Sequence, residues 1–276
     1  MDRGAYGAGK GSIPQERIVQ KLDEYMGRRD YEGAERHLLY WLEEARAVSD
    51  RRGELMVRNE LVGHFRKVGN KERALANVDE ALRLVDELGL GATVSAGTTY
   101  VNAATACNAF GRDERSLELF KKAAQVYEQN SGTAPHLLGG LYNNMALVCV
   151  ATGDFERADK LYERALATMA GVENGELEQA ITYLNMADAA VARVRAALGV
   201  APDAPPAEAF IADASCEEAV ESYLDAALAL LDAPSLPHDG YYAFVCEKCA
   251  PTFAYYGYFL IDADLRERAK EIYERA

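Results

Sequence analysis

"GDFERADKLYERAL", residues 153–166, is a stretch whose pattern recurs at a fixed interval along the chain. "GNKERALANVDEAL" begins at Gly69 and "GRDERSLELFKKAA" begins at Gly111, so the leading glycines are 42 residues apart each time (69, 111 and 153). Each glycine follows one amphipathic helical pattern and precedes another, as expected of a glycine that ends a helix. The spacing therefore predicts repeated pairs of helices.

The second helix of each pair carries small residues where two helices would approach each other. Ala158 stands at the fifth position after Gly153, and Ala165 follows seven residues later. The equivalent small residues are Ala74 with Ala81 and Ser116 with Ala123. A bulky residue, Tyr162 in this stretch, lies four positions after the first small one. Small residues let helices come close, and the bulky residue fills the groove beside them.

The same register extends outward to six helix pairs. They are expected at about residues 14–51, 53–90, 92–130, 135–171, 175–232 and 238–276. Residues 1–13 are expected to form a flexible tail, and residues 14–276 one repeat domain. A single pair cannot bury its apolar face, whereas stacked pairs share a continuous core. Because no strand pattern interrupts the repeats, the fold class is predicted to be all-α.

The small–bulky–alanine run of the second helices and the "YNNMA" run of a first helix, residues 142–146, resemble the tetratricopeptide repeat (TPR) family. The resemblance covers nearly the whole chain after residue 14. The 42-residue interval exceeds that family's usual length of about 34 and is similar to the longer repeats of kinesin light chains and of some bacterial peptide-sensing regulators. Trp41 departs from the pattern, since an alanine is expected there. The resemblance implies a right-handed α-solenoid of about six antiparallel helix pairs.

The fifth pair contains an insertion. The small residue of the first helix and that of the second are 12 residues apart in pairs 2 to 4, but 32 apart in pair 5, from Ala187 to Ala219. "GVAPDAPPAEAF", residues 199–210, has prolines that cannot continue a helix interior. We expect the first helix to run to about Leu198. We expect residues 199–209 to form a loop that folds back over the surface, where a protease would cut first.

Two adjacent asparagines stand inside an apolar helix, in "YNNMALV", residues 142–148. At 100° per residue, Tyr142 and Met145 belong to the core stripe of that helix. Asn144 faces away from this stripe, and Asn143 does so less completely. Counted from the small residues of the first helices, positions 102, 144 and 185 are equivalent, and all three are asparagine.

The TPR resemblance implies that the first helices line a concave groove and that this asparagine position faces it. The candidate binding residues are Asn102, Asn143, Asn144 and Asn185. An amide side chain offers both a donor and an acceptor, which suits the backbone of a bound segment whatever its side chains. The alternative is that these asparagines hold the backbone of the next repeat or face water.

The net charge of −14 argues against a nucleic-acid partner, because a phosphate backbone attracts a basic surface. The charge is uneven: residues 171–250 hold 3 basic and 14 acidic residues. This region would steer a basic protein segment toward itself, or it is a solvated acidic face that aids solubility. No apolar run has the length of a membrane span, and no signal-peptide core is present, so a cytoplasmic location without membrane contact is expected.

No pattern in the chain indicates catalysis, a metal or a cofactor. "CEKC", residues 246–249, has zinc-ligand spacing but lacks a second ligand pair, so two core cysteines are expected. "GAYGAGKG", residues 4–11, nearly matches the phosphate-binding loop motif. Such a loop follows a β-strand, and the three residues before this one are too few to form a strand. The four histidines show no spacing with an acid or a nucleophile that suggests a reaction. The sequence therefore predicts a protein that is not an enzyme.

Two functions remain open. The first is a non-catalytic module that holds a protein or peptide segment in the groove. The second is a structural scaffold that self-assembles, most simply as a homodimer, through the aromatic run at residues 241–259, with Tyr255, Tyr258 and Phe259 as candidate contacts. Pro251 is expected to kink or break its helix and turn some of these rings outward. The alternative is a well-filled core at one end of a longer protein.

Overall fold

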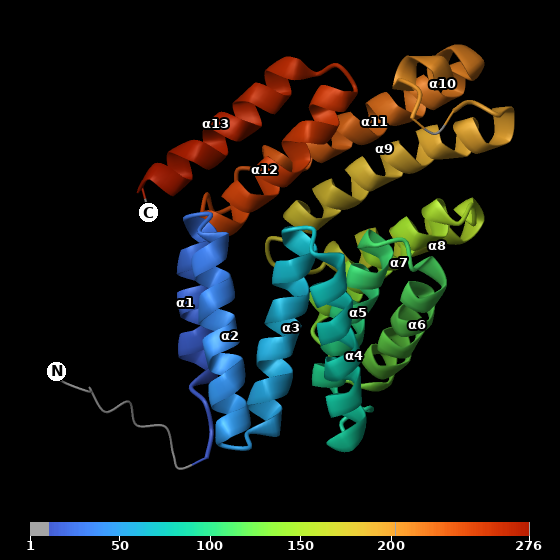
Figure 1. Ribbon diagram of the computed structural model, residues 1–276. Helices are drawn as coiled ribbons and strands as arrows, with labels where there is room; N and C mark the ends of the chain where they lie inside the picture. The colour runs from blue at the N-terminus through green and yellow to red at the C-terminus, as the bar shows by residue number, and fades with distance from the viewer. Residues whose placement is uncertain (1–10, 202, 276) are drawn as a thin grey trace. The chain divides into compact units, whose positions relative to one another are not determined.

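The computed structural model describes residues 11–201 and 203–275. Within these residues it contains thirteen α-helices and no strand (Figure 1). The fold class is therefore all-α, as predicted. The glycine-rich residues 4–11 and the expected tail at residues 1–13 lie almost wholly outside the described residues, and so does Pro202 of the insertion.

The helices divide into two compact units, Met1–Gly132 and Thr133–Ala276. The first unit holds three antiparallel hairpins. Its helices are α1 (Gln15–Gly27), α2 (Tyr31–Ala47), α3 (Arg51–Lys67), α4 (Lys71–Glu87), α5 (Val94–Ala109) and α6 (Asp113–Gln129). Consecutive hairpins pack together, α2 against α3 and α3 and α4 against α5.

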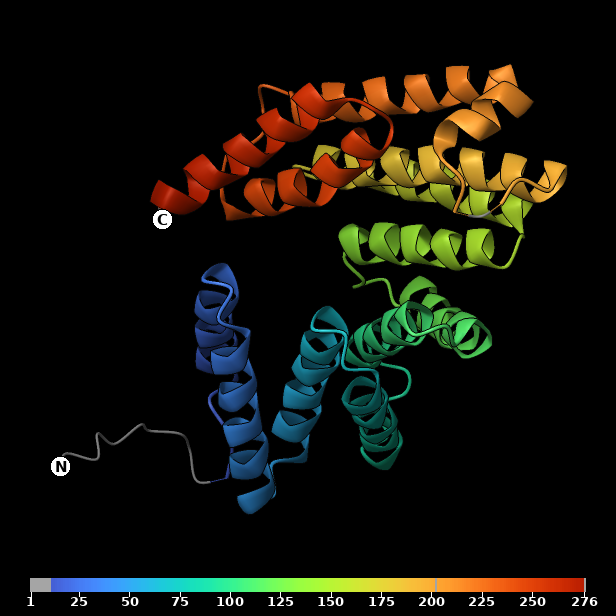
Figure 2. The same ribbon diagram turned by 45° about the horizontal axis from the view of Figure 1, so that its top comes forward.

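The second unit holds three further hairpins, drawn in green to red in Figure 2. Its helices are α7 (Pro135–Ala151), α8 (Phe155–Met169), α9 (Glu176–Leu198), α10 (Pro206–Ala212), α11 (Ala214–Leu231), α12 (Gly240–Tyr255) and α13 (Phe259–Arg275). The hairpins are α7 with α8, α9 with α11, and α12 with α13. With the first unit this makes the expected six pairs. We call the first helix of each pair its A helix and the second its B helix.

Local signals in the sequence account for the helix boundaries. Asp154 caps α8 by accepting a hydrogen bond from the backbone N–H of Arg157. Gly153 just before it has a φ of +79°, a left-handed conformation that glycine adopts without strain. The same turn in the first pair uses Arg29 at a φ of +55°. The turn is thus set by the repeat geometry, with glycine as the preferred but not obligatory residue.

The small residues lie where the register predicted a close approach. Ala34, Ala74, Ser116 and Ala158 are completely buried in the described structure. Ala219, the expected equivalent in the fifth pair, is only half-buried, and Val220 beside it is buried instead. Ser116, which replaces alanine in the third pair, donates its hydroxyl to the backbone oxygen of Ala104 at 2.8 Å. Ser116 lies in the B helix and Ala104 in the A helix of the same hairpin, so this bond marks the crossing point itself.

The insertion of the fifth pair is better ordered than expected. Helix α9 ends at Leu198, as predicted, and Gly199 follows with a φ of +68°. Beyond it, residues 206–212 form α10, which packs against α9 and α11 with Ala209 fully buried. The loop prediction is therefore wrong for these residues. Pro206 is the reason: at the first turn of a helix its fixed φ favours helix formation, and its absent N–H costs nothing.

Helix α12 continues through Pro251 from Gly240 to Tyr255, so the expected break does not occur. Cys249, Ala250 and Phe253 are buried around the proline. Their burial against the core holds the helix in register across the one backbone hydrogen bond that proline cannot make.

All five cysteines are buried and none forms a disulfide, and the two cysteines of "CEKC" are core residues, as expected. In the described residues no cluster of histidine, cysteine or carboxylate side chains could hold a metal ion. A separate search of the same residues finds no helix whose length and apolar character would let it cross a bilayer.

Candidate functional site

In the second unit the A helices lie next to one another: α7 packs against α9, and α9 packs against α12. We call the surface that they share the A-helix face. Three of the four predicted binding residues, Asn143, Asn144 and Asn185, lie on these helices. The fourth, Asn102, lies on α5 in the first unit.

Asn143 does not face outward as expected. Its side chain is only 7% exposed, and its Oδ1 accepts a hydrogen bond of 3.1 Å from the Nδ2 of Asn185. The expectation failed because α9 packs so closely on α7 that position 143 faces the next hairpin rather than solvent. These two amides join neighbouring A helices, which agrees in part with the alternative that asparagines here hold the next repeat.

Asn144 and Asn102 are half-buried, and neither side chain forms a hydrogen bond with any residue that the structure describes. Asn185 is also half-buried and uses one amide proton on Asn143. The three equivalent asparagines thus differ. The side-chain amides of Asn102 and Asn144 form no hydrogen bond within the described residues, whereas the amide of Asn185 already donates one to Asn143.

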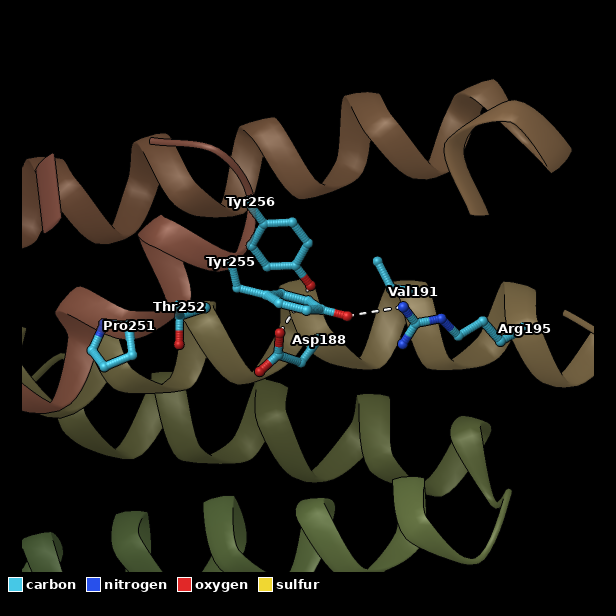
Figure 3. Close-up of a pocket in the computed structure, with 7 residues that line it drawn as sticks. All are labelled: Asp188, Val191, Arg195, Pro251, Thr252, Tyr255 and Tyr256. Carbon is cyan, nitrogen blue, oxygen red and sulfur yellow. Dashed lines mark hydrogen bonds between the residues drawn. The ribbon is translucent and has the colours of Figure 1, made fainter. Parts of the chain in front are cut away.

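A cavity of about 380 Å³ opens between α9 and α12 (Figure 3). We call it the Asp188 pocket. Its lining residues are Asp188, Val191 and Arg195 of α9 and Pro251, Thr252, Tyr255 and Tyr256 at the end of α12. Asp188 follows Asn185 by three residues, so both lie on the same side of α9. The pocket therefore continues the row of polar side chains on the A-helix face.

The Asp188 carboxylate has an unusual set of neighbours. The Tyr256 hydroxyl donates a hydrogen bond of 2.8 Å to its Oδ1. Within the described part of the chain it has no salt-bridge partner. Crowding by the surrounding protein raises its pKa above the ordinary value, although the Tyr256 hydrogen bond and the charge of Arg195 act in the opposite direction. Solvent still reaches the carboxylate through the mouth of the pocket.

Arg195 organises the other side of the pocket. It donates a hydrogen bond of 2.8 Å to the Tyr255 hydroxyl and another to the backbone oxygen of Ala204. The first bond positions the Tyr255 ring at the rim, and the second ties the insertion to α9. The Tyr255 and Tyr256 rings meet edge to face with centroids 5.1 Å apart. Phe210 of α10 stacks on Tyr256 at 6.4 Å, so the insertion supports the pocket from outside.

The first unit has a related carboxyl group, Glu60 on α3. Glu60 is two residues before Val62, and Asn102 is two residues before Ala104, the residue equivalent to Val62 in the next pair. Glu60 and Asn102 therefore occupy the same position of the repeat. Burial raises its pKa, and the negative charge of Asp23 adds to the effect. Among the described residues, Glu60 has neither a hydrogen bond nor an ion pair through its side chain.

Sequence reasoning missed Asp188, Tyr256 and Glu60. Extending the asparagine register to the second pair would have found Glu60, and following the helix one turn past Asn185 would have found Asp188. No local signal could have found Tyr256, because it is 68 residues from the carboxylate it contacts.

The aromatic run near the C-terminal end is only partly exposed. Tyr255 is 47% exposed and Phe259 is 69% exposed, and Leu260 beside it is 88% exposed. Tyr258, the third predicted contact, is half-buried and packs against the core of the second unit. Several rings do turn outward, but the helix carries them there without the break that was expected at Pro251.

No protein-family model matches the chain, and no curated protein matches it significantly. Among solved structures, BtubC (BKLC) from P. vanneervenii is similar with a TM-score of 0.46 and 18% identity, over 95% of this chain and 91% of that one. Two structures of Podosopora anserina kinesin light chain TPR-like repeats have a TM-score of 0.48 and 15% and 16% identity, over 79% of this chain and 93% and 94% of theirs. All three TM-scores are below 0.5, so the similarity does not indicate a function.

The architecture is established by the hairpins themselves and by the buried small residues at their crossing points. In its described residues the chain is an all-α helical repeat built from antiparallel hairpins.

Proposed function

We propose that this chain is a non-catalytic interaction module that binds a segment of another protein along the A-helix face of the second unit. The observation that carries the proposal is the Asp188 pocket, which is lined in part by the helix that carries Asn185. A cavity with a few converging polar groups and a carboxylate of perturbed pKa is the usual mark of a binding site.

The polar row and the pocket would act together. Each hydrogen bond from an amide side chain to a bound backbone contributes about 0.5–1.5 kcal/mol net. The amides of Asn144 and Asn185 alone would therefore hold a segment weakly. The pocket adds an anchor that fixes one side chain of the segment, and an anchor of this kind often carries most of the binding energy at an interface.

The test is a peptide-display selection with the wild type, followed by affinity measurements on the selected peptides. We expect Asn144→Ala to weaken binding by about 1 kcal/mol while the melting temperature stays nearly unchanged, because its side chain forms no hydrogen bond within the described fold. Ser222→Ala, which removes an exposed hydroxyl from the B helix α11, is the matched control. Failure of the wild type to select any peptide, or equal binding by Asn144→Ala, contradicts the proposal.

Self-assembly is a second candidate, favoured by the exposure of Phe259 and Leu260 at the start of α13. Adjacent exposed apolar side chains of this size are typical of protein interfaces. The occupant we propose is a second copy of this chain, in a two-fold homodimer. Light scattering after chromatography should show a dimer at tens of micromolar, and Phe259→Glu should make it a monomer with unchanged helix content. A wild-type monomer under these conditions rules this function out.

The proposed partner segment is basic, as the acidic composition of residues 171–250 suggested. The five cysteines are buried and none forms a disulfide, which fits a reducing compartment and supports the expected cytoplasmic location.

A further inference from the structure

We infer that the Asp188 pocket binds a lysine or arginine side chain of the partner segment, with the Asp188 carboxylate as its counter-ion. The inference rests on the proposed function for the segment that carries this side chain. The pocket itself can be tested without that segment.

The Asp188 carboxylate can accept a further hydrogen bond from a cationic side chain. One oxygen, Oδ1, accepts the Tyr256 hydrogen bond, and the other oxygen has no hydrogen-bond partner in the described residues. The residue is exposed at the mouth of the pocket, so a cation from outside can reach this second oxygen. A lysine or arginine head group that enters the pocket would form an ion pair with the carboxylate and donate a hydrogen bond to its second oxygen.

The shape of the pocket suits a long cationic side chain. Its volume of about 380 Å³ exceeds that of one amino-acid side chain and lies in the range of small-ligand pockets, about 300–1,000 Å³. Val191 and Pro251 give apolar walls for the methylene stem, as basic side chains require. The rings of Tyr255 and Tyr256 stand beside Asp188, and aromatic rings attract cations through their faces.

Arg195 is the one cation in the lining, and it weighs against a second positive charge. Its guanidinium donates to the Tyr255 hydroxyl and to the backbone oxygen of Ala204, and its charge acts to lower the pKa of Asp188. The wider charge balance acts the other way, since residues 171–250 contain 14 acidic and 3 basic residues. The repulsion from this arginine is thus set against the net negative charge of residues 171–250, which attracts cations toward this part of the chain.

An anion is the opposite possibility, and the geometry disfavours it. An anion held by Arg195 would have to lie in the same cavity as the Asp188 carboxylate and would be repelled by it. The Tyr256 hydroxyl, one of the neutral donors in the lining, is already directed at Asp188. The cation is therefore the occupant that the arranged groups favour.

The direct test uses n-butylguanidinium chloride as a probe of the pocket, with n-butanol as its neutral counterpart. We expect the backbone amide NMR signals of Val191, Thr252 and Tyr255 to shift with the cation and to stay in place with the alcohol. Asp188→Asn, which keeps the shape and the acceptor for Tyr256, should abolish the shifts. Glu218→Gln removes one exposed carboxylate from α11 and should leave them intact.

Equal shifts with both probes, no shift with the cation, or unchanged shifts in Asp188→Asn would each overturn the inference. The comparison of cation and alcohol in the wild type decides the matter even if the variant fails to fold.

The peptide selection then separates this inference from the proposed function. We expect peptides selected by the wild type to be enriched in lysine or arginine at one position, and replacing that residue by norleucine to lower affinity at least fivefold. In Asp188→Asn the same replacement should have little effect, because the two changes remove one interaction. Selected peptides without this enrichment overturn the inference and leave the proposed function standing. If the wild type selects no peptide but the amide shifts are present, the proposed function is overturned and the inference about the pocket stands.

Discussion

The Asp188 carboxyl accepts a hydrogen bond from Tyr256, and the surrounding protein raises its pKa against the opposing effects of that bond and of the Arg195 charge. The folded protein therefore binds a proton at this site more tightly than the unfolded chain does. The stability linked to this group is present at low pH and is lost as the pH rises from the ordinary value of 3.8 through the folded-state pKa. The ionised carboxylate thus disfavours the folded state at neutral pH.

We accordingly predict that Asp188→Asn is at least as stable as the wild type at pH 7, and that any gain in stability shrinks as the pH falls toward 4. Asparagine keeps an acceptor for the Tyr256 hydroxyl but carries no charge. Urea denaturation across this pH range measures the effect, and Glu218→Gln controls for the loss of one negative charge. A clear loss of stability at pH 7 would show that the carboxylate stabilises the fold instead.

At the scale of elements, the insertion shows how a segment rich in proline becomes structural. Helix α10 is only 7 residues long, yet it buries Ala209 and stacks Phe210 on Tyr256. A helix this short does not form alone in water, so its order comes from packing on α9 and α11. The Asp188 pocket depends on this packing, because Tyr256 is held between α10 and Asp188.

We predict that Ala209→Glu releases α10, since a glutamate cannot be buried there without a partner. Brief digestion with a non-specific protease should then cut first within residues 199–213, whereas the wild type should resist cutting there. Ala207→Glu adds the same side chain at an exposed position of α10 and is the matched control. Equal cutting in both variants, or in the wild type, would mean that burial of Ala209 does not hold the segment.

At the scale of the whole molecule, the net charge of −14 is concentrated late in the chain, where residues 171–250 have a balance of 3 basic to 14 acidic residues. Such a field raises the local concentration of a basic partner before any contact forms. It decays over about 10 Å at 0.1 M salt, so its contribution depends on ionic strength.

We therefore predict that a selected peptide containing lysine binds more weakly as salt rises from about 0.05 to 0.5 M, mainly through a slower association rate. The norleucine version of the same peptide should lose much less affinity over this range. Stopped-flow kinetics with both peptides measures the difference. Identical salt dependence for the two peptides would show that charge does not steer the partner.

Much of the architecture follows from the sequence alone. The 42-residue interval, the turn glycines and the crossing alanines predicted six helix pairs, and the prolines after Gly199 predicted that α9 ends at Leu198. These signals are local: each depends on the conformational range of one residue or on the period of one helix, so they can be recognised without a partner in space.

Tertiary packing decided the rest. Asn143 is buried because α9 lies against α7, and wheel geometry for one helix cannot include a neighbour. Pro206 begins a helix only because α9 and α11 give that helix a surface to pack on. The Asp188 pocket joins residues of α9 to residues at the end of α12, with Asp188 and Tyr256 separated by 68 positions. A site made from side chains so far apart in sequence exists only after the hairpins stack, because the stacking distance sets which groups meet.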